Sequence, residues 1–531
     1  MAVAQQVLPA TPQILLKHKG RLSGKDLWRQ NLSLASLAAY KIGSSLGPKG
    51  AYKLVTYHRG PELVMKVTKD PIDIVDELGI EYPAKLTLAE AAKIQRQHTG
   101  DGISSLLVLV SSLLTQADKL MGMGFHQNTI LDGFLKATEK SAEIINEVGR
   151  IYSENLDEHL LEVVDCGREL LSKRLRNELS EAVTRATENG SVDITRIRIV
   201  KKPGGQVDDT KLVRGVIIKQ GKAHFNMPDL LNEPKVAFLN KLEIKRRELI
   251  SKDEGPFVAK LNITDQGQIQ SFKLEENRLR NLMVETIKAS GANILFCRTK
   301  IDDRTVDLLG RQGIFTAHFV GADDFEAAAR ATRATIAATP DQLGKEDLGI
   351  ARKLEVDKIK PDQIIVLHCD EGATVLLRSS SPELLEELEK TVKKALLILK
   401  HSRSNSKVVP GGGAILAELA KELRKYALTF EGRGQFVISS YADALEKITE
   451  CLSINYGLDP IDTMIQLRNA HAKGERGTGI GAQGCEDMYD ANIIELSSVN
   501  KANVNRAFEL VSLLLRIDDC FYVKDIPKFH K

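Results

Sequence analysis

The chain has 531 residues, of which 43% are hydrophobic and 27% charged, a balance typical of folded globular proteins. This length exceeds what one hydrophobic core supports, so we expect about three or four domains. The 74 basic and 71 acidic residues leave a net charge of +3, which argues against nucleic acid as the main partner, because that role needs a basic excess on one face.

Two further features argue against secretion and against membrane insertion. The N-terminal stretch MAVAQQVLPATPQILLKHKG lacks a charged segment followed by an apolar core, so we do not expect a signal peptide. The longest apolar run, Ile103 to Leu114, is too short to span a bilayer. The cysteines lack the paired spacing of a zinc or redox site and indicate a reducing, cytoplasmic compartment: Cys166, Cys297, Cys369, Cys451, Cys485 and Cys520.

The first part of the chain, residues 25–150, has helical periodicity throughout. Apolar residues recur at helical spacing in two early segments, one of which contains Leu86, Ala91 and Ile94. Residues 103–121 are apolar on nearly all sides, which predicts a buried helix. We expect another helix from about Thr129 to Val148.

The middle of the chain mixes helical and strand patterns. Helices are expected at 158–175 and 178–187, and alternating apolar residues predict strands at 196–200 and 212–221. Further strands, separated by helical patterns, indicate an α/β region: 236–240, 292–297, 313–320 and 362–369. Helices return after Pro382 and include 414–426 and 436–451. The organisation is therefore nested, with helical ends, mixed connectors and an α/β centre.

Three glycine-bearing turns are candidate phosphate sites: SSLGPKG (44–50), TGDGISS (99–105) and VVPGGGA (408–414). Glycine lets backbone amides approach an anion, and a helix N-terminus adds unpaired N–H groups and a favourable dipole. Asp101 is suited to hold a phosphate-bridging Mg²⁺. Lys49 is either a phosphate counter-charge or a solvated lysine. Each turn alone is a weak signal, and none has Walker or Rossmann spacing.

Taken in order along almost the whole chain, these turns and three other motifs resemble the motif series of the group II chaperonins, the archaeal thermosome and eukaryotic cytosolic type. The three other motifs are TKD (68–70), YGLDPID (456–462) and LLRIDD (514–519). Among these proteins the chain looks most like a divergent archaeal thermosome subunit.

The resemblance implies an α+β multidomain fold. It assigns a largely helical equatorial domain to residues 1–152 and 408–531, and a mixed α/β intermediate domain to 153–221 and 372–407. It assigns an α/β apical, substrate-binding domain to 222–371, with a helical lid protrusion at about 245–282. The lid is expected to carry Phe257, Val258, Leu261, Ile263 and Phe272.

The resemblance also implies a site for ATP or ADP with Mg²⁺. Asp101 would hold the metal, Asp70 would position the attacking water, and Lys173 would sense the γ-phosphate. Glu495 would lie near the ribose and adenine. The remaining implied nucleotide contacts come mostly from the glycine turns: Gly47, Lys49, Gly102, Ile103, Ser104, Ser105, Gly411 and Gly412.

The sequence departs from the family pattern where the chemistry is expected. Lys394 stands at the position of the family's catalytic aspartate, and an ammonium cannot accept a proton from water unless burial removes its charge. Ile103 replaces a threonine hydroxyl. The other departures are Pro71 for glycine, Asp73 for threonine, Leu416 for glutamate, Tyr456 for alanine, Gly481 for aspartate, and RSSS at 378–381.

Two functions remain open at this stage. One is an ATP-driven folding subunit that binds and encloses unfolded proteins. The other is a non-hydrolysing ring subunit that binds clients while paralogous subunits of a double-ring hetero-oligomer hydrolyse ATP. The lysine at 394 favours weakened or absent hydrolysis, whereas the retained Asp70 and Asp101 favour a working enzyme. A metabolic kinase is excluded by the spacing of the glycine turns.

Overall fold

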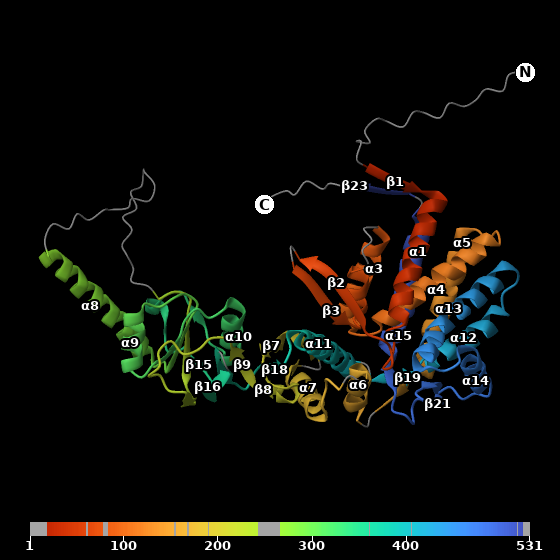
Figure 1. Ribbon diagram of the computed structural model, residues 1–531. Coiled ribbons are helices and arrows are strands. Elements are labelled where there is room, and N and C mark those ends of the chain that lie inside the picture. The colour runs from red at the N-terminus through yellow and green to blue at the C-terminus, as the bar shows by residue number, and fades with distance from the viewer. Residues whose placement is uncertain are drawn as a thin grey trace, which may run out of the picture. The chain divides into compact units, whose positions relative to one another are not determined.

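Two compact units make up the structure, a computed structural model shown in Figure 1. One contains residues 1–176 and 390–531, and the other contains residues 177–389. The described residues are 19–59, 62–77, 83–152, 155–166, 169–188, 191–242, 266–359, 362–404, 406–517 and 519–523.

The first unit is built around one buried helix, α4 (Ile103–Gly122). Twelve of its residues are buried, and α1 (Gly24–Gly43), α13 (Arg433–Tyr456) and α15 (Ser497–Arg516) pack against it. The prediction of a buried helix at 103–121 is confirmed. The helix is long and apolar enough to cross a membrane, but most of it lies inside this core.

The remaining elements of the first unit surround this core (Figure 1). The helices are α2 (Pro71–Asp76), α3 (Pro83–Thr99), α5 (Gln127–Val148), α6 (Leu156–Asp165), α12 (Ala414–Ala427) and α14 (Pro460–Ala472). Strands β4 (Arg150–Ile151), β19 (Lys407–Pro410) and β22 (Ile494–Leu496) form one sheet. Three antiparallel pairs join β1 (Lys19–Ser23) to β23 (Asp519–Val523), β2 (Lys53–Arg59) to β3 (Glu62–Thr68), and β20 (Thr478–Gly481) to β21 (Gly484–Asp487).

Two helices are shared by the units along the chain. Helix α7 (Lys173–Arg185) carries the chain from the first unit into the second, and α11 (Pro382–Ser404) carries it back. The predicted return of helices after Pro382 is confirmed by α11.

Two expectations for the first unit are wrong. Residues 25–150 are not helical throughout, because β2 and β3 form an antiparallel hairpin in which Leu54 pairs with Val67. Both side chains are exposed on one face of the hairpin. The helix expected at 158–175 ends at Asp165, because Cys166 adopts a left-handed conformation with φ of 49°.

The second unit contains the sheets of the predicted α/β centre. A parallel core of β11 (Lys235–Leu239), β12 (Ile294–Cys297), β13 (Phe315–Ala317) and β14 (Ile336–Ala337) is extended by the antiparallel β15 (Gly349–Ile350). An antiparallel sheet has the order β10 (Leu230–Asn232), β16 (Lys353–Ile359), β17 (Asp362–His368) and β9 (Gly215–Ile218). A third sheet contains β7 (Ile197–Pro203), β18 (Ala373–Ser379) and β8 (Lys211–Val213), and β5 (Thr187–Glu188) pairs with β6 (Ser191–Val192). The helices are α8 (Gln266–Ser290), α9 (Asp303–Arg311) and α10 (Ala322–Thr332), with short 3₁₀ turns at Ile194–Arg196, Val207–Asp209 and Pro340–Gln342.

Two strand predictions in this unit need correction. The strand expected at 212–221 is two strands, β8 and β9, which Arg214 separates where Gly215 has φ of 136°. The strand expected at 313–320 is limited to β13. Of the expected lid, Phe257, Val258, Leu261 and Ile263 lie outside the described residues, as does the side chain of Phe272, and residues 266–282 belong to α8.

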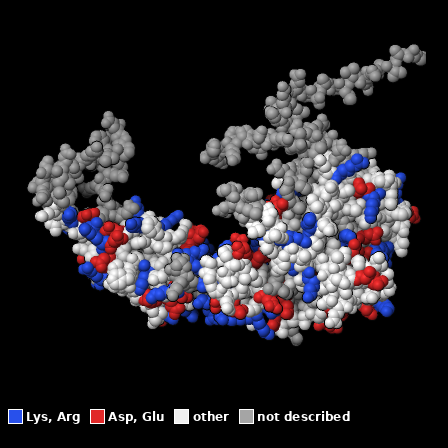
Figure 2. Space-filling view, viewed as in Figure 1, with Lys and Arg blue, Asp and Glu red and all other residues white. Residues whose placement is uncertain are grey.

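Charged side chains of both signs are interspersed over much of the face shown in Figure 2. This mixture agrees with the small net charge of the chain.

The central position of α4 predicts a large effect of a cavity in this helix. Leu113→Ala removes a fully buried side chain, and we expect it to lower the free energy of unfolding by about 2–5 kcal/mol. The single tryptophan, Trp28 on α1, donates a hydrogen bond to Asp118 on α4, so its fluorescence in a urea titration reports this unit. The control is Leu86→Ala, at a side chain that is 72% exposed, and an equal loss in both variants would contradict the central role of α4.

Candidate functional site

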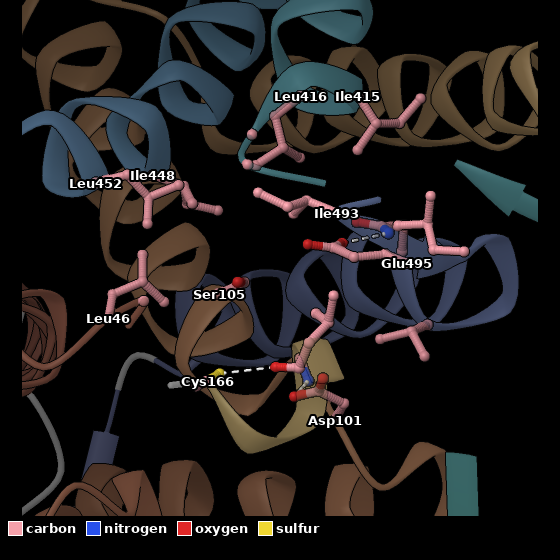
Figure 3. A pocket seen from close by; sticks show the side chains of 18 of the residues that line it. Leu46, Asp101, Ser105, Cys166, Ile415, Leu416, Ile448, Leu452, Ile493 and Glu495 are labelled. Atoms are coloured by element: carbon pink, nitrogen blue, oxygen red, sulfur yellow. Dashed lines mark hydrogen bonds between the residues drawn. The ribbon is translucent and has the colours of Figure 1, made fainter. Parts of the chain in front are cut away.

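A cavity of about 320 Å³ lies within the first unit. Its wall is formed by the N-terminal ends of α4 and α12, by α6, α11 and α15, and by the loop between α1 and β2, which contributes Gly47. Figure 3 shows Asp101 on one side of this cavity and Leu416, Ile448 and Leu452 on another. The cavity therefore has one end with a charged group and one apolar end.

Two helix N-termini meet at the cavity. Gly102 precedes α4 and Gly413 precedes α12, and both are N-cap residues in the left-handed region, with φ of 80° and 79°. Neither helix has a side-chain cap on its first N–H groups. Such a terminus favours an anion through its N–H groups and its dipole. The cavity wall is thus suited to bind phosphate groups.

Glycine is required at these turns for steric reasons. A Cβ atom at Gly102 would lie 2.6 Å from Nδ2 of Asn503, and one at Gly412 would lie 2.5 Å from Sδ of Met488. Both glycines have positive φ, which L-residues with a side chain adopt at a cost. The backbone of both turns is therefore fixed close to its neighbours.

The carboxylate of Asp101 is held by a lysine from α11. Nζ of Lys394 lies 2.9 Å from Oδ1 of Asp101, and the backbone N–H of Gly102 donates to the same oxygen at 2.7 Å. The backbone carbonyl of Asp101 accepts from Thr99 and Gln95. In the described part of the chain, no group of three or more His, Cys, Asp or Glu is arranged to hold a metal ion.

Asp70 lies in a separate cluster of ion pairs. It is the N-cap of α2, where Oδ1 accepts from the backbone N–H of Ile72 at 3.0 Å. Arg96 also binds Oδ1, and Nζ of Lys390 lies 3.3 Å from Oδ2. Asp70 is buried and does not line the cavity.

Asp73 joins this cluster one helical turn further on. Lys390 and Lys66 bind its two oxygens at 2.5 and 2.9 Å. Burial alone would raise the pKa of Asp73, but the hydrogen bonds and charges of the two lysines outweigh it and lower the pKa below its ordinary value. The cluster therefore engages both acids with cations.

Glu495 lies in the cavity wall opposite Leu416 (Figure 3). Its Oε2 accepts from Nδ2 of Asn500 at 2.8 Å. Burial raises the pKa of the Glu495 carboxyl, and the charge of Asp101 acts in the same direction, against the effects of Asn500 and Lys394. Leu416, which stands in place of the expected glutamate, lines the same cavity.

The structure brings together part of the predicted site. The predicted residues that line the cavity are Gly47, Asp101, Gly102, Ser105, Lys394, Gly412 and Glu495. Tyr456, expected beside the site, also lines it. Ile103, Ser104 and Gly411 adjoin lining residues without lining the cavity, and Ile103 is buried in the core.

Two predicted lysines lie away from the cavity wall. Lys49 is exposed, and the Lys173 side chain is 74% exposed with Nζ 3.0 Å from Oε1 of Glu158. Sequence reasoning did not single out Gly413, Cys166 or Asn503 as lining residues, nor Lys390 as the partner of Asp70. Of these residues, only Gly413 could have been identified from the local sequence, because it belongs to the same GGG run as the predicted Gly412.

Comparison with known proteins places this cavity in context. Residues 39–524 match the sequence profile of the TCP-1/cpn60 chaperonin family. The chain is 33% identical to a thermosome subunit of Methanopyrus kandleri over 97% of this chain and 96% of that protein. It is 34% identical to the thermosome subunit beta of Methanothermobacter thermautotrophicus over 98% of this chain and 95% of that protein. It is 32% identical to the thermosome subunit beta of Thermoplasma acidophilum over 96% of this chain and 95% of that protein.

The contacts at Gly102 predict a specific steric effect. Gly102→Ala is expected to lower the free energy of unfolding of this unit by about 1–3 kcal/mol more than Gly124→Ala, because overpacking adds to the cost of the left-handed backbone. Gly124 is a matched control, since its φ is 86° and a Cβ there would meet nothing within 4 Å. Urea titrations followed by Trp28 fluorescence measure both variants. Equal losses would show that the wall around Gly102 yields to the new methyl group.

The raised pKa of Glu495 predicts a pH-dependent effect on stability. The folded chain binds this proton more tightly than the unfolded chain, so the stabilisation is present at low pH and is lost as the pH rises through the folded-state pKa. Glu495→Gln keeps an acceptor for Asn500 and removes this loss. We expect a gain in stability on the order of 1 kcal/mol at about pH 8 and a smaller gain at about pH 5, because the loss of stability caused by Glu495 grows as the pH rises.

The control for this experiment is Glu162→Gln, which changes an exposed carboxylate in the same wall. Thermal unfolding of the three proteins at both pH values provides the measurement. A gain in the stability of Glu495→Gln that does not change with pH would contradict the raised pKa of Glu495.

Proposed function

Because the chain belongs to the TCP-1/cpn60 chaperonin family, whose relatives here are thermosome subunits, we propose that it is a group II chaperonin subunit with a weak or absent ATPase activity. Group II chaperonins assist protein folding, and the family depends on nucleotide. The proposed ligand of the cavity is ATP or ADP, and Asp101 is the carboxylate that faces any accompanying Mg²⁺.

The observation that carries the nucleotide proposal is the meeting of two glycine-capped helix N-termini at one cavity. Backbone N–H groups of α4 and α12 supply donors for phosphate oxygens without requiring side chains. The apolar end of the cavity, with Leu416, Ile448 and Leu452, suits a planar base. A ligand with an anionic part and an apolar part needs both the backbone N–H donors and the apolar side chains.

Weak hydrolysis follows from the groups beside Asp101. Hydrolysis requires a group that accepts a proton from the attacking water, and loss of a positioned base typically costs about 10²–10⁴-fold in rate. Lys394 is the residue beside Asp101, and its ammonium has no lone pair with which to accept a proton. Asp70, the second expected acid, is engaged with Arg96 and Lys390. These two arrangements support a subunit that binds nucleotide and turns it over slowly.

The partners and domains proposed from the resemblance complete this function. We propose equatorial, intermediate and apical domains at the boundaries expected from the sequence. We also propose assembly with paralogous subunits into a double ring in the cytoplasm, where unfolded proteins are the clients. Some relatives are named thermosome subunit alpha and others thermosome subunit beta, which supports assembly from more than one kind of subunit. Paralogous subunits that keep an acid at the position of Lys394 would supply the ATP turnover.

A fully active ATPase is the second candidate, favoured by the retention of Asp70 and Asp101. The two candidates differ in rate rather than in ligand. In the active case another carboxylate would have to accept the proton.

A single-turnover measurement of γ-phosphate release separates these candidates. We expect slow release from the purified chain, and we expect Lys394→Asp to raise the rate by about 10-fold or more, because it supplies a proton acceptor. Lys393→Asp is the control, since it makes the same change at the exposed neighbouring residue of α11. Release from the unmodified chain at the rate of an active chaperonin would refute the weak-hydrolysis proposal.

A further inference from the structure

The contact between Lys394 and Asp101 occupies the place expected for a divalent cation. A metal ion between a carboxylate and a polyphosphate neutralises both, and Mg²⁺ does so at about 2.0–2.1 Å from oxygen ligands. In this chain a lysine ammonium already lies 2.9 Å from Oδ1 of Asp101. The same oxygen also accepts the N–H of Gly102, so two donors from the protein engage it.

The charges of the cavity wall also favour a built-in cation at Asp101. Among the described residues that line the cavity, Lys394 is the one cation, and the acids are Asp101, Glu162 and Glu495. A nucleotide diphosphate or triphosphate brings several negative charges into this wall. Helix N-termini contribute only partial charges, so a full positive charge is needed near Asp101.

The position of Lys394 is fixed by its helix. The side chain is 22% exposed, which is low for a lysine, and its neighbours Ala395 and Ile398 on α11 are buried. Lys390, four residues earlier on the same helix, binds Asp70 and Asp73. Residues four apart lie on one face of a helix. Helix α11 therefore supplies a built-in cation to each of the two acidic loops.

We propose that the ammonium of Lys394 takes the role of the divalent cation at Asp101, so that this pocket binds a nucleotide polyphosphate without Mg²⁺. This inference rests on the proposed nucleotide-binding function. It assigns to Lys394 a binding role in addition to the loss of a proton acceptor. The Asp101 carboxylate is a poor site for a metal ion, because its Oδ1 already engages Lys394 and the N–H of Gly102.

The test is equilibrium binding of a fluorescent ADP analogue, mant-ADP, to the purified full-length chain, once with EDTA and once with excess Mg²⁺. We expect dissociation constants that differ by less than about threefold between the two conditions, since a factor of ten corresponds to a full ion-pair contribution. This comparison uses the unmodified protein, so it does not depend on the folding of any variant.

Variants test the role of the ammonium. Lys394→Met keeps much of the side-chain length without the charge, and we expect it to weaken mant-ADP binding in EDTA by about tenfold or more, with partial recovery on addition of Mg²⁺. Lys393→Met is the matched control on the same helix and should behave as the unmodified chain. Circular dichroism establishes that each variant is folded.

The outcomes distinguish the two proposals. Binding to the unmodified chain only in the presence of Mg²⁺ would overturn the role of Lys394 and leave the nucleotide pocket intact. Equal binding in EDTA by folded Lys394→Met and the unmodified chain would overturn it as well. Absence of mant-ADP binding under both conditions would overturn the nucleotide function and, with it, this inference.

Discussion

Burial of α4 is the constraint on which the first unit depends. Leu106, Leu113 and Leu114 are fully buried in this helix, and burying each such side chain contributes about 1.5–3 kcal/mol. The helix cannot shift along its axis without exposing part of this surface to water. Its N-terminal end is therefore held in place, and with it Gly102 and Asp101. The most hydrophobic segment of the chain thus positions the most polar part of the cavity.

The cavity combines two environments that oppose each other electrostatically. The glycine turns before α4 and α12 favour an anion, whereas Glu495 and the apolar residues around Leu416 disfavour charge. A ligand satisfies both only if its charged part and its apolar part are separated. The raised pKa of Glu495, caused first by burial, is consistent with a cavity wall that disfavours a buried charge.

Local patterns predicted part of this arrangement, and contacts distant in sequence account for the rest. The apolar run at 103–121 and the glycine turns predicted α4 and the cavity wall, because burial and positive φ leave direct marks in sequence. The β2–β3 hairpin was missed, since Leu54 and Val67 lie on an exposed face and its short apolar alternation competes with helical readings. The replacement at Lys394 was visible in sequence, but its contact with Asp101 depends on how α11 packs. No local pattern indicates that Arg96 and Lys390 bind Asp70.

The two lysines on α11 have a mechanical consequence. Lys390 binds the acids before and within α2, and Lys394 binds the acid before α4, so one helical face is tied to two separate loops. Turning α11 about its own axis would break both attachments at once. The ion pairs to the two loops therefore restrain rotation of α11 about its axis. Loss of either ion-pair attachment would leave this face of α11 held to one acidic loop instead of two.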